Sequence, residues 1–256
     1  MNSIIWYELL TSDPDAATAF YSKVLGWKTT DSGQADRDYR IFNKDDVAIG
    51  GLMALPAGAA EAGMPPGWLG YVGVKDVDVC VAGALATGGT EFMPAVDIPD
   101  VGRIALIGDP QGAALYLMSG SGTATSNSYA PGKPGHGGWH ELHTSNWQEA
   151  WAFYSAQLDW QKAEEMDMGP MGTYLLFDDG SNVRMGGMFN NPMAPRAYWL
   201  YYFNVQNIDE ANELVKAHGG TTLQGPIQVP TGDWIIQAFD PQGALFALVG
   251  PRTQAH

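Results

Sequence analysis

The most restrictive feature of this sequence is an internal repeat, because two similar stretches of chain must fold in similar ways. Residues 6–9, Trp-Tyr-Glu-Leu, return as Trp-His-Glu-Leu at residues 139–142. Residues 109–113, Asp-Pro-Gln-Gly-Ala, return unchanged at residues 240–244. An Asp-Pro-x-Gly turn alone would be a common local motif, but further matches in register with it extend along both halves. The sequence therefore predicts a duplicated chain with two similar halves.

The two halves are separated by a segment rich in glycine, serine and proline. Residues 121–137 contain few side chains that could be buried, and this composition is typical of a linker. We therefore predict a first domain over residues 1–120, a linker over residues 121–137 and a second domain over residues 138–256.

Each half contains two units in which one strand and one helix precede three further strands. The first helix begins at Asp13, a favourable N-cap, with Pro14 in its first turn. Asn146 starts the matching helix of the second half, and Asp78 is expected to cap the helix over residues 79–85. These signals predict an α+β fold of four βαβββ modules in two tandem halves. Each half would be a curved mixed sheet that encloses a cleft and carries its helices outside.

The composition limits the classes of partner and the compartment. Asp and Glu outnumber Lys and Arg by 28 to 13, so the net charge is −15 and binding to nucleic acid or an anionic membrane is unfavourable. No stretch of sequence is apolar for long enough to span a bilayer, and the first residues lack the features of a signal peptide. The single cysteine, Cys80, excludes an internal disulfide. We expect a cytoplasmic monomer or homodimer that binds a small organic molecule.

The repeated motifs resemble those of the vicinal oxygen chelate superfamily, which includes glyoxalases, extradiol dioxygenases and bleomycin-binding resistance proteins. The resemblance rests on the opening strand, the Ser-Asp-Pro helix start at residues 12–14, the Phe-Tyr pair on that helix, the Leu-Gly-Trp after it and the Asp-Pro-Gln-Gly-Ala turn. The Trp-x-Glu-Leu sequence in each half is similar to the tandem, glyoxalase-like branch. The resemblance covers nearly the whole chain apart from the linker, and it implies the fold more strongly than the reaction.

In the metal-dependent members of that superfamily, a first-strand His, Gln or Glu and a last-strand Glu hold the metal. The resemblance carries these positions onto six residues of this chain, none of which is a good ligand of a divalent ion. They are Trp6, Leu69, Tyr116, Trp139, Leu200 and Ala247. The resemblance therefore implies that the usual metal site is missing. We predict no cofactor, with an atypical divalent-metal site as the alternative.

Strand alternation predicts which side chains of the opening strands face the cleft. Glu8 and Glu141 stand two residues after the tryptophan of each half and share its face. A carboxylate on an inward face is costly unless it is hydrogen-bonded, and such a group could act as a general base. Because the glutamate occurs in both halves, a structural role is favoured over catalysis.

His143 breaks the repeat, since its counterpart in the first half is Leu10. With Glu141 it could form a catalytic acid–base pair or part of an atypical metal site, although a buried histidine satisfied by its neighbours is the more common case. Other aromatic and polar residues would bind the ligand, and Arg103 among them could bind an anionic group. The predicted ligand-binding residues are Trp6, Glu8, Tyr71, Arg103, Tyr116, Trp139, Tyr202 and Asn204.

Three functions remain open on the sequence alone. We favour the metal-free binding of a small hydrophobic or aromatic organic molecule in an aromatic-lined cleft. The alternative is a lyase, isomerase or dioxygenase reaction at an atypical site around Glu141 and His143. The third is a structural or regulatory protein whose clefts are vestigial.

Overall fold

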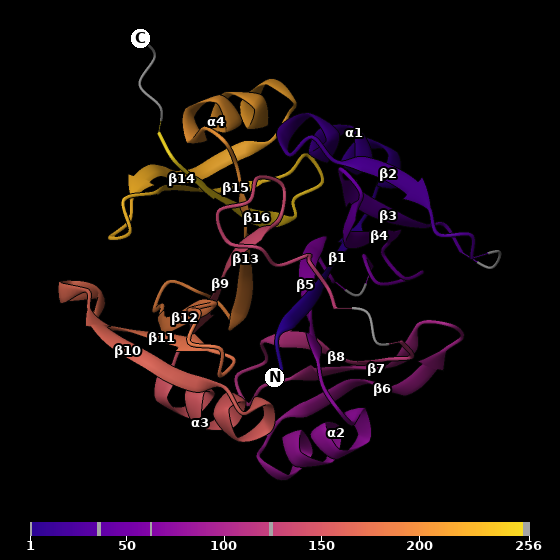
Figure 1. Ribbon diagram of the computed structural model, residues 1–256, viewed down its shortest axis with the longest axis vertical. Helices are drawn as coiled ribbons and strands as arrows, with labels where there is room; N and C mark the ends of the chain where they lie inside the picture. The colour runs from indigo at the N-terminus through magenta and orange to yellow at the C-terminus, as the bar shows by residue number, and fades with distance from the viewer. Residues whose placement is uncertain (1, 35–36, 62, 123–124, 253–256) are drawn as a thin grey trace. The chain divides into compact units, whose positions relative to one another are not determined.

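The computed structural model describes residues 2–34, 37–61, 63–122 and 125–252. Within these residues there are sixteen β-strands, four α-helices and one short 3-10 helix, and the strands form two eight-stranded mixed sheets (Figure 1). One sheet comes from the first half of the chain and the other from the second half. The predicted α+β fold with two tandem halves is therefore confirmed. None of the helices within the described residues is long and apolar enough to cross a membrane.

The two sheets have the same order of strands. The first is ordered β2-β3-β4-β1-β5-β8-β7-β6, and the second is ordered β10-β11-β12-β9-β13-β16-β15-β14. The elements of the first half are β1 (Ile4–Thr11), α1 (Pro14–Val24), β2 (Lys28–Asp31), β3 (Tyr39–Lys44), β4 (Val47–Ala54), β5 (Gly67–Gly73), α2 (Val77–Ala86), β6 (Thr90–Ile98), β7 (Gly102–Gly108) and β8 (Ala114–Gly120). Strand β1 pairs in parallel with β4, so the opening strand lies inside its sheet.

The second half repeats this order of elements. They are β9 (Gly137–Thr144), α3 (Trp147–Leu158), β10 (Gln161–Asp167), the 3-10 helix η1 (Gly169–Met171), β11 (Thr173–Asp178), β12 (Gly186–Asn190), β13 (Tyr198–Asn204), α4 (Ile208–Ala217), β14 (Thr221–Gln228), β15 (Trp234–Phe239) and β16 (Leu245–Gly250). Strand β9 pairs in parallel with β12, as β1 does with β4.

Side-chain caps start the helices where turn-forming residues precede an apolar stretch. Asp13 and Asn146 accept hydrogen bonds from backbone N–H groups in the first turns of α1 and α3, as predicted. The expectation that Asp78 caps α2 is wrong. Asp76 is the N-cap, so the helix begins earlier and Asp78 lies in its first turn.

Packing divides the chain into two compact units that cut across the two sequence halves. Unit 1 consists of Met1–Ile5, Leu69–Thr125 and His140–Leu200, and unit 2 consists of Trp6–Trp68, Ser126–Trp139 and Tyr201–His256. Helix α2 packs against α3 in unit 1, and α1 packs against α4 in unit 2 (Figure 1). Each unit therefore combines a module of the first half with a module of the second, whereas the predicted domains follow the sequence repeat.

The later part of the segment between the halves, residues 126–137, belongs to unit 2. Ser128 and His136 are completely buried, and Nδ1 of His136 lies 2.6 Å from the carbonyl oxygen of Asn127. Burial lowers the pKa of His136, so its ring is neutral at neutral pH. Ser128 and His136 are therefore two exceptions to the expectation that residues 121–137 contain few side chains that could be buried.

Candidate functional site

A hydrogen-bonded pair of side chains on β9 forms the centre of the candidate site. Nε2 of His143 lies 2.8 Å from Oε1 of Glu141, and the Tyr174 hydroxyl on β11 donates to Oε2 of Glu141 at 2.8 Å. The His143 side chain is 5% exposed and that of Glu141 is 12% exposed. The two residues share one face of the strand, as the alternation predicts.

The partner of the second ring nitrogen determines the tautomer of His143. Its Nδ1 lies 2.9 Å from Nδ2 of Asn191, which follows β12. The backbone N–H of Met193 donates to Oδ1 of Asn191 at 3.0 Å, so the amide presents its Nδ2 donor to the histidine. From this pattern we assign His143 as an acceptor at Nδ1 and a donor at Nε2, toward Glu141. With both nitrogens engaged, proton exchange with a ligand requires one of these bonds to open.

Aromatic rings surround the imidazole. The ring of Tyr198 on β13 stacks on His143 with centroids 4.5 Å apart and an interplanar angle of 10°. Phe189 meets His143 edge-on at 4.8 Å and stacks with Tyr174 at 5.7 Å. Burial, and then the charge of Glu141, raise the pKa of Tyr198 to about 12. The Tyr198 hydroxyl is therefore protonated at neutral pH, and the site combines flat apolar surface with a neutral donor.

The first half has the same glutamate arrangement without the histidine. Glu8 on β1 is 2% exposed, and the Tyr39 hydroxyl donates to its Oε2 at 2.9 Å. The indole N–H of Trp6 donates to the same hydroxyl at 3.1 Å. Leu10, which is buried, stands where the second half has His143. The hydrogen bond from a tyrosine hydroxyl to the glutamate occurs in both halves, which supports a structural role for both glutamates. His143 is the feature that the first half lacks.

Glycines on the neighbouring strands let the tyrosines reach the glutamates. Gly187 on β12 pairs with Glu141 on β9, and a Cβ atom at this glycine would lie 2.0 Å from the Tyr174 ring. In the first half, a Cβ atom at Gly51 would lie 2.0 Å from the Tyr39 hydroxyl oxygen. Only glycine leaves room for a tyrosine ring to cross the strand at these two positions.

Sequence reasoning missed five residues of these arrangements, which are Tyr39, Tyr174, Phe189, Asn191 and Tyr198. A signal existed for the two tyrosines, because the doubled glycines at residues 50–51 and 186–187 indicate a close approach of another group. Tyr198 also breaks the repeat, because the repeat aligns it with Gly67, and this difference between the halves was a signal of the same kind as the one that singled out His143.

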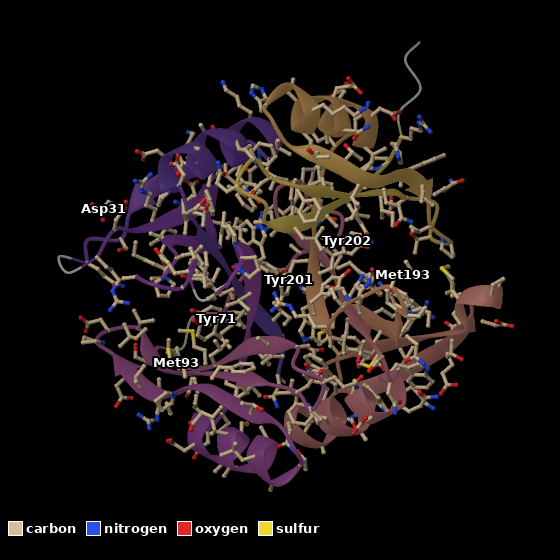
Figure 2. All side chains as sticks on the ribbon, turned by 180° about the vertical axis from the view of Figure 1, so that it is seen from behind. Asp31, Tyr71, Met93, Met193, Tyr201 and Tyr202 are labelled. Carbon is tan, nitrogen blue, oxygen red and sulfur yellow. The ribbon has the colours of Figure 1, made fainter. Side chains whose placement is uncertain are left out.

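The other aromatic residues predicted to bind the ligand are divided between the units. In unit 1, Tyr71 on β5 stacks on Tyr116 on β8, with centroids 4.3 Å apart and an interplanar angle of 17°. In unit 2, Tyr202 on β13 is buried, and Nε2 of Gln237 lies 3.1 Å from its hydroxyl oxygen. Trp139 is half-buried in β9. Figure 2 labels Tyr71 and Tyr202. Tyr71 and Tyr116 thus lie together as a stacked pair in unit 1.

Asn204 has a structural role that the sequence did not indicate. Its Nδ2 donates to the carbonyl oxygens of Ala130 at 3.1 Å and His136 at 3.0 Å, and its Oδ1 accepts from the backbone N–H of Gly132 at 3.0 Å. The side chain therefore holds residues 130–136 in place. This use of its amide leaves little support for the predicted contact with a ligand.

Arg103 is engaged by two carboxylates. Its guanidinium donates from Nε and Nη2 to the Asp78 carboxylate, at 2.8 Å each, and its Nη1 lies 3.1 Å from Oδ1 of Asp97. Because the carboxylates of Asp78 and Asp97 already pair with the guanidinium, the structure does not support the prediction that Arg103 binds an anionic ligand.

The donor set does not match a metal site. Among the described residues, no group of three His, Cys, Asp or Glu side chains is placed to hold a metal ion. At the positions carried over from metal-dependent proteins, Leu200 and Ala247 are buried apolar residues. Glu141 and His143 provide two candidate ligands that bind each other, which is half of a typical site at most.

A cavity of about 220 Å³ lies within unit 2. Its walls come from the end of α1, Lys44, residues 134–135 and the segment 204–214, which includes the start of α4. Asn204 is the one predicted ligand-binding residue in this lining, and its amide is already bonded to protein groups. The cavity therefore adds no support for the predicted site.

Comparison with known proteins agrees with the fold. A family model described as "Glyoxalase/Bleomycin resistance protein/Dioxygenase superfamily" matches residues 3–117 and 136–248. The chain is 32% identical to "Putative glyoxylase CFP32" of Mycobacterium tuberculosis, over 97% of this chain and 95% of that protein. It is 28% identical to "Anthracycline biosynthesis protein DauV" of Streptomyces sp. (strain C5), over 96% of this chain and 92% of that protein. The fold is similar to that of the 2,3-dioxygenase LapB from Pseudomonas sp. KL28, with a TM-score of 0.66, 16% identity, and coverage of 100% of this chain and 93% of that one. The chain therefore belongs to the glyoxalase/bleomycin resistance protein/dioxygenase superfamily.

Proposed function

We propose that this chain binds a small, flat organic molecule on aromatic side chains and needs no metal ion to do so. The observation that carries this proposal is the chemistry of the six positions carried over from metal-dependent proteins. In this chain they hold Trp, Leu, Tyr and Ala, which offer apolar surface in place of ion ligands. Flat rings bury apolar area well against such surfaces.

Two further observations support an aromatic ligand. Tyr71 and Tyr116 form a stacked pair, and the rings of Tyr198, His143 and Phe189 form a second aromatic group. DauV, a relative that matches this chain along nearly its whole length, is named for anthracycline biosynthesis, and anthracyclines are flat polycyclic compounds.

The metal-free part of the proposal is tested on full-length protein purified without chelators from medium that contains zinc, manganese, iron and nickel. We expect far less than one bound ion per chain and no change in the thermal unfolding midpoint on addition of EDTA. Stoichiometric metal that is lost in the variant His143→Ala would overturn this part of the proposal.

The ligand-binding part is tested by thermal unfolding with a panel of flat aromatic molecules. A ligand present at roughly 100 times its dissociation constant stabilises the native state by about 2.7 kcal/mol, which is a measurable rise of the midpoint. If no member of the panel raises the midpoint, the binding proposal fails and the clefts are better regarded as vestigial.

Acid–base catalysis is a second candidate, and one observation favours it. His143 replaces an apolar residue of the first half, and its bond to Glu141 resembles a general base held by an orienting carboxylate. The name of a relative agrees with an enzymatic function, because CFP32 of Mycobacterium tuberculosis is named "Putative glyoxylase". In such a reaction, release of Asn191 would free Nδ1 to take a proton from the substrate. Turnover by the wild type that falls about 100-fold or more in His143→Leu, with ligand binding retained, would establish this function.

A further inference from the structure

The hydroxyl of Tyr198 is a polar group of the site around Glu141 and His143 that could form a hydrogen bond with a ligand. The Tyr174 hydroxyl donates to Glu141, and the two nitrogens of His143 bond to Glu141 and Asn191. No hydrogen bond joins the Tyr198 hydroxyl to another residue in the part of the chain that the structure describes. A partly buried hydroxyl gains free energy when a partner is supplied.

The position of Tyr198 also provides a surface for a flat ring. His143 covers one face of its ring at a centroid distance of 4.5 Å, and the residue as a whole is half-buried. Its neighbours in the aromatic group are buried or half-buried too, so a ligand ring would extend an existing stack. A flat molecule gains most from this arrangement because stacking and edge contacts both need planar rings.

The electrostatics of the site select against an anionic ligand. Burial and the carboxylate of Glu141 both disfavour negative charge at the Tyr198 oxygen, which is why the pKa of this phenol is raised. A ligand carboxylate or phenolate placed there would meet the same repulsion. An uncharged acceptor avoids this cost, because it accepts the hydrogen bond without bringing a second negative charge.

We propose that Tyr198 anchors the ligand by donating a hydrogen bond, and that the ligand is an uncharged planar aromatic ketone whose carbonyl oxygen is the acceptor. A carbonyl group conjugated with a ring lies in the plane of that ring, so the same molecule can stack and accept the bond. This inference rests on the proposed function, because it names the ligand class for the binding that the proposed function describes.

A matched set of probes tests the inference on the full-length chain. The planar ketone 9-fluorenone, its methylene counterpart fluorene and the anionic 9-fluorenone-4-carboxylate share one ring system. We expect the wild type to bind fluorenone more tightly than either of the other two. In Tyr198→Phe, which keeps the ring and removes the hydroxyl, the affinity for fluorenone should fall about five-fold, as expected for one neutral hydrogen bond. The affinity for fluorene should stay unchanged and serves as the control for intact stacking.

The outcomes separate this inference from the proposed function. Equal binding of fluorenone by the wild type and by Tyr198→Phe would overturn the role of Tyr198 while metal-free aromatic binding stands. Tighter binding of the carboxylate than of fluorenone would overturn the ligand class. Failure of every aromatic molecule in the wider panel would overturn the proposed function, and this inference with it.

Discussion

The hydroxyl of Tyr154 on α3 donates a hydrogen bond at 3.1 Å to the buried carboxylate of Asp109, which lies in the turn before β8. The indole N–H of Trp199 donates to the same hydroxyl at 3.0 Å. Unit 2 repeats this arrangement with equivalent residues. They are Tyr21, Asp240 and Trp68, at 3.0 Å for both bonds. In each unit the bond joins a helix of one sequence half to a turn of the other, which helps to explain why packing groups the modules across the halves.

Removal of the Tyr154 hydroxyl should therefore destabilise the fold. In Tyr154→Phe the Asp109 carboxylate and the Trp199 indole N–H each lose a buried partner, so we expect the free energy of unfolding to fall by about 1–3 kcal/mol. Denaturant unfolding measures this change. Tyr198→Phe is the matched control, because its hydroxyl has no hydrogen bond within the described residues, and its effect should stay within about 0.5 kcal/mol. Equal effects of the two substitutions would contradict this account.

The parts of the fold that depend on local pattern were predictable from the sequence. The repeat located the four modules, Asp13 and Asn146 marked the starts of α1 and α3, and alternation placed Glu141 and His143 on one face of a strand. Each of these features is determined by residues that are close in sequence, so the pattern contains the information.

The partners of those residues were not predictable, because they come from distant segments. Tyr174 lies 33 residues after Glu141, and only the register of β9, β12 and β11 brings the two together. The sequence predicts a ligand contact for Asn204, whereas the partners of its side chain lie 68, 72 and 74 residues earlier, in a segment whose composition is typical of a linker. Contacts of this kind require the sheet register and the path of the chain, neither of which a single sequence supplies.

Burial of His140 should make the stability of the fold depend on pH. His140 is 1% exposed, and its Nδ1 donates to the carbonyl oxygen of Met185 at 2.7 Å. Burial lowers the pKa of His140 to about 4. The hydrogen bond to Met185 raises the pKa, but its effect is smaller than that of burial. Because the pKa of His140 is below the unfolded value of about 6.5, the unfolded chain binds the proton first. The stability associated with neutral His140 is therefore present above about pH 6.5 and is lost as the pH falls toward 4.

The variant His140→Asn isolates this contribution, because an asparagine amide can replace the Nδ1 donor and does not titrate. Between about pH 7 and pH 4, the wild type should lose about 3 kcal/mol more stability than the variant. Chemical unfolding at several pH values measures the free energy of unfolding of each protein. Both proteins contain the same carboxylates, so the contribution of these groups to the pH dependence cancels in the difference. Parallel stability curves for the two proteins would show that His140 is not held neutral by its surroundings.

Gly187 should tolerate no side chain, because the Tyr174 ring occupies the space above it. A Cβ atom there would lie 2.0 Å from a ring carbon of Tyr174, so Gly187→Ala must displace the ring that donates to Glu141. We expect a loss of about 1–3 kcal/mol in the free energy of unfolding. Gly67→Ala is the matched control, because a Cβ atom at that strand position meets nothing within 4 Å. Similar effects at both glycines would place the Tyr174 ring elsewhere.

The ionisation of Tyr198 tests its contact with the charge of Glu141. The pKa of Tyr198 is raised to about 12 by burial and by Glu141, whereas an unperturbed tyrosine ionises near about 10. Tyrosinate absorbance recorded up to about pH 11 should therefore be the same for the wild type and Tyr198→Phe, since Tyr198 ionises above this range. In Glu141→Gln, loss of the negative charge should lower the pKa of Tyr198 and bring part of its absorbance into the measured range, and the double variant Glu141→Gln, Tyr198→Phe should abolish that part. If Tyr198→Phe already removes absorbance near about pH 10, the hydroxyl is exposed and distant from Glu141, and the electrostatic argument for an uncharged ligand fails.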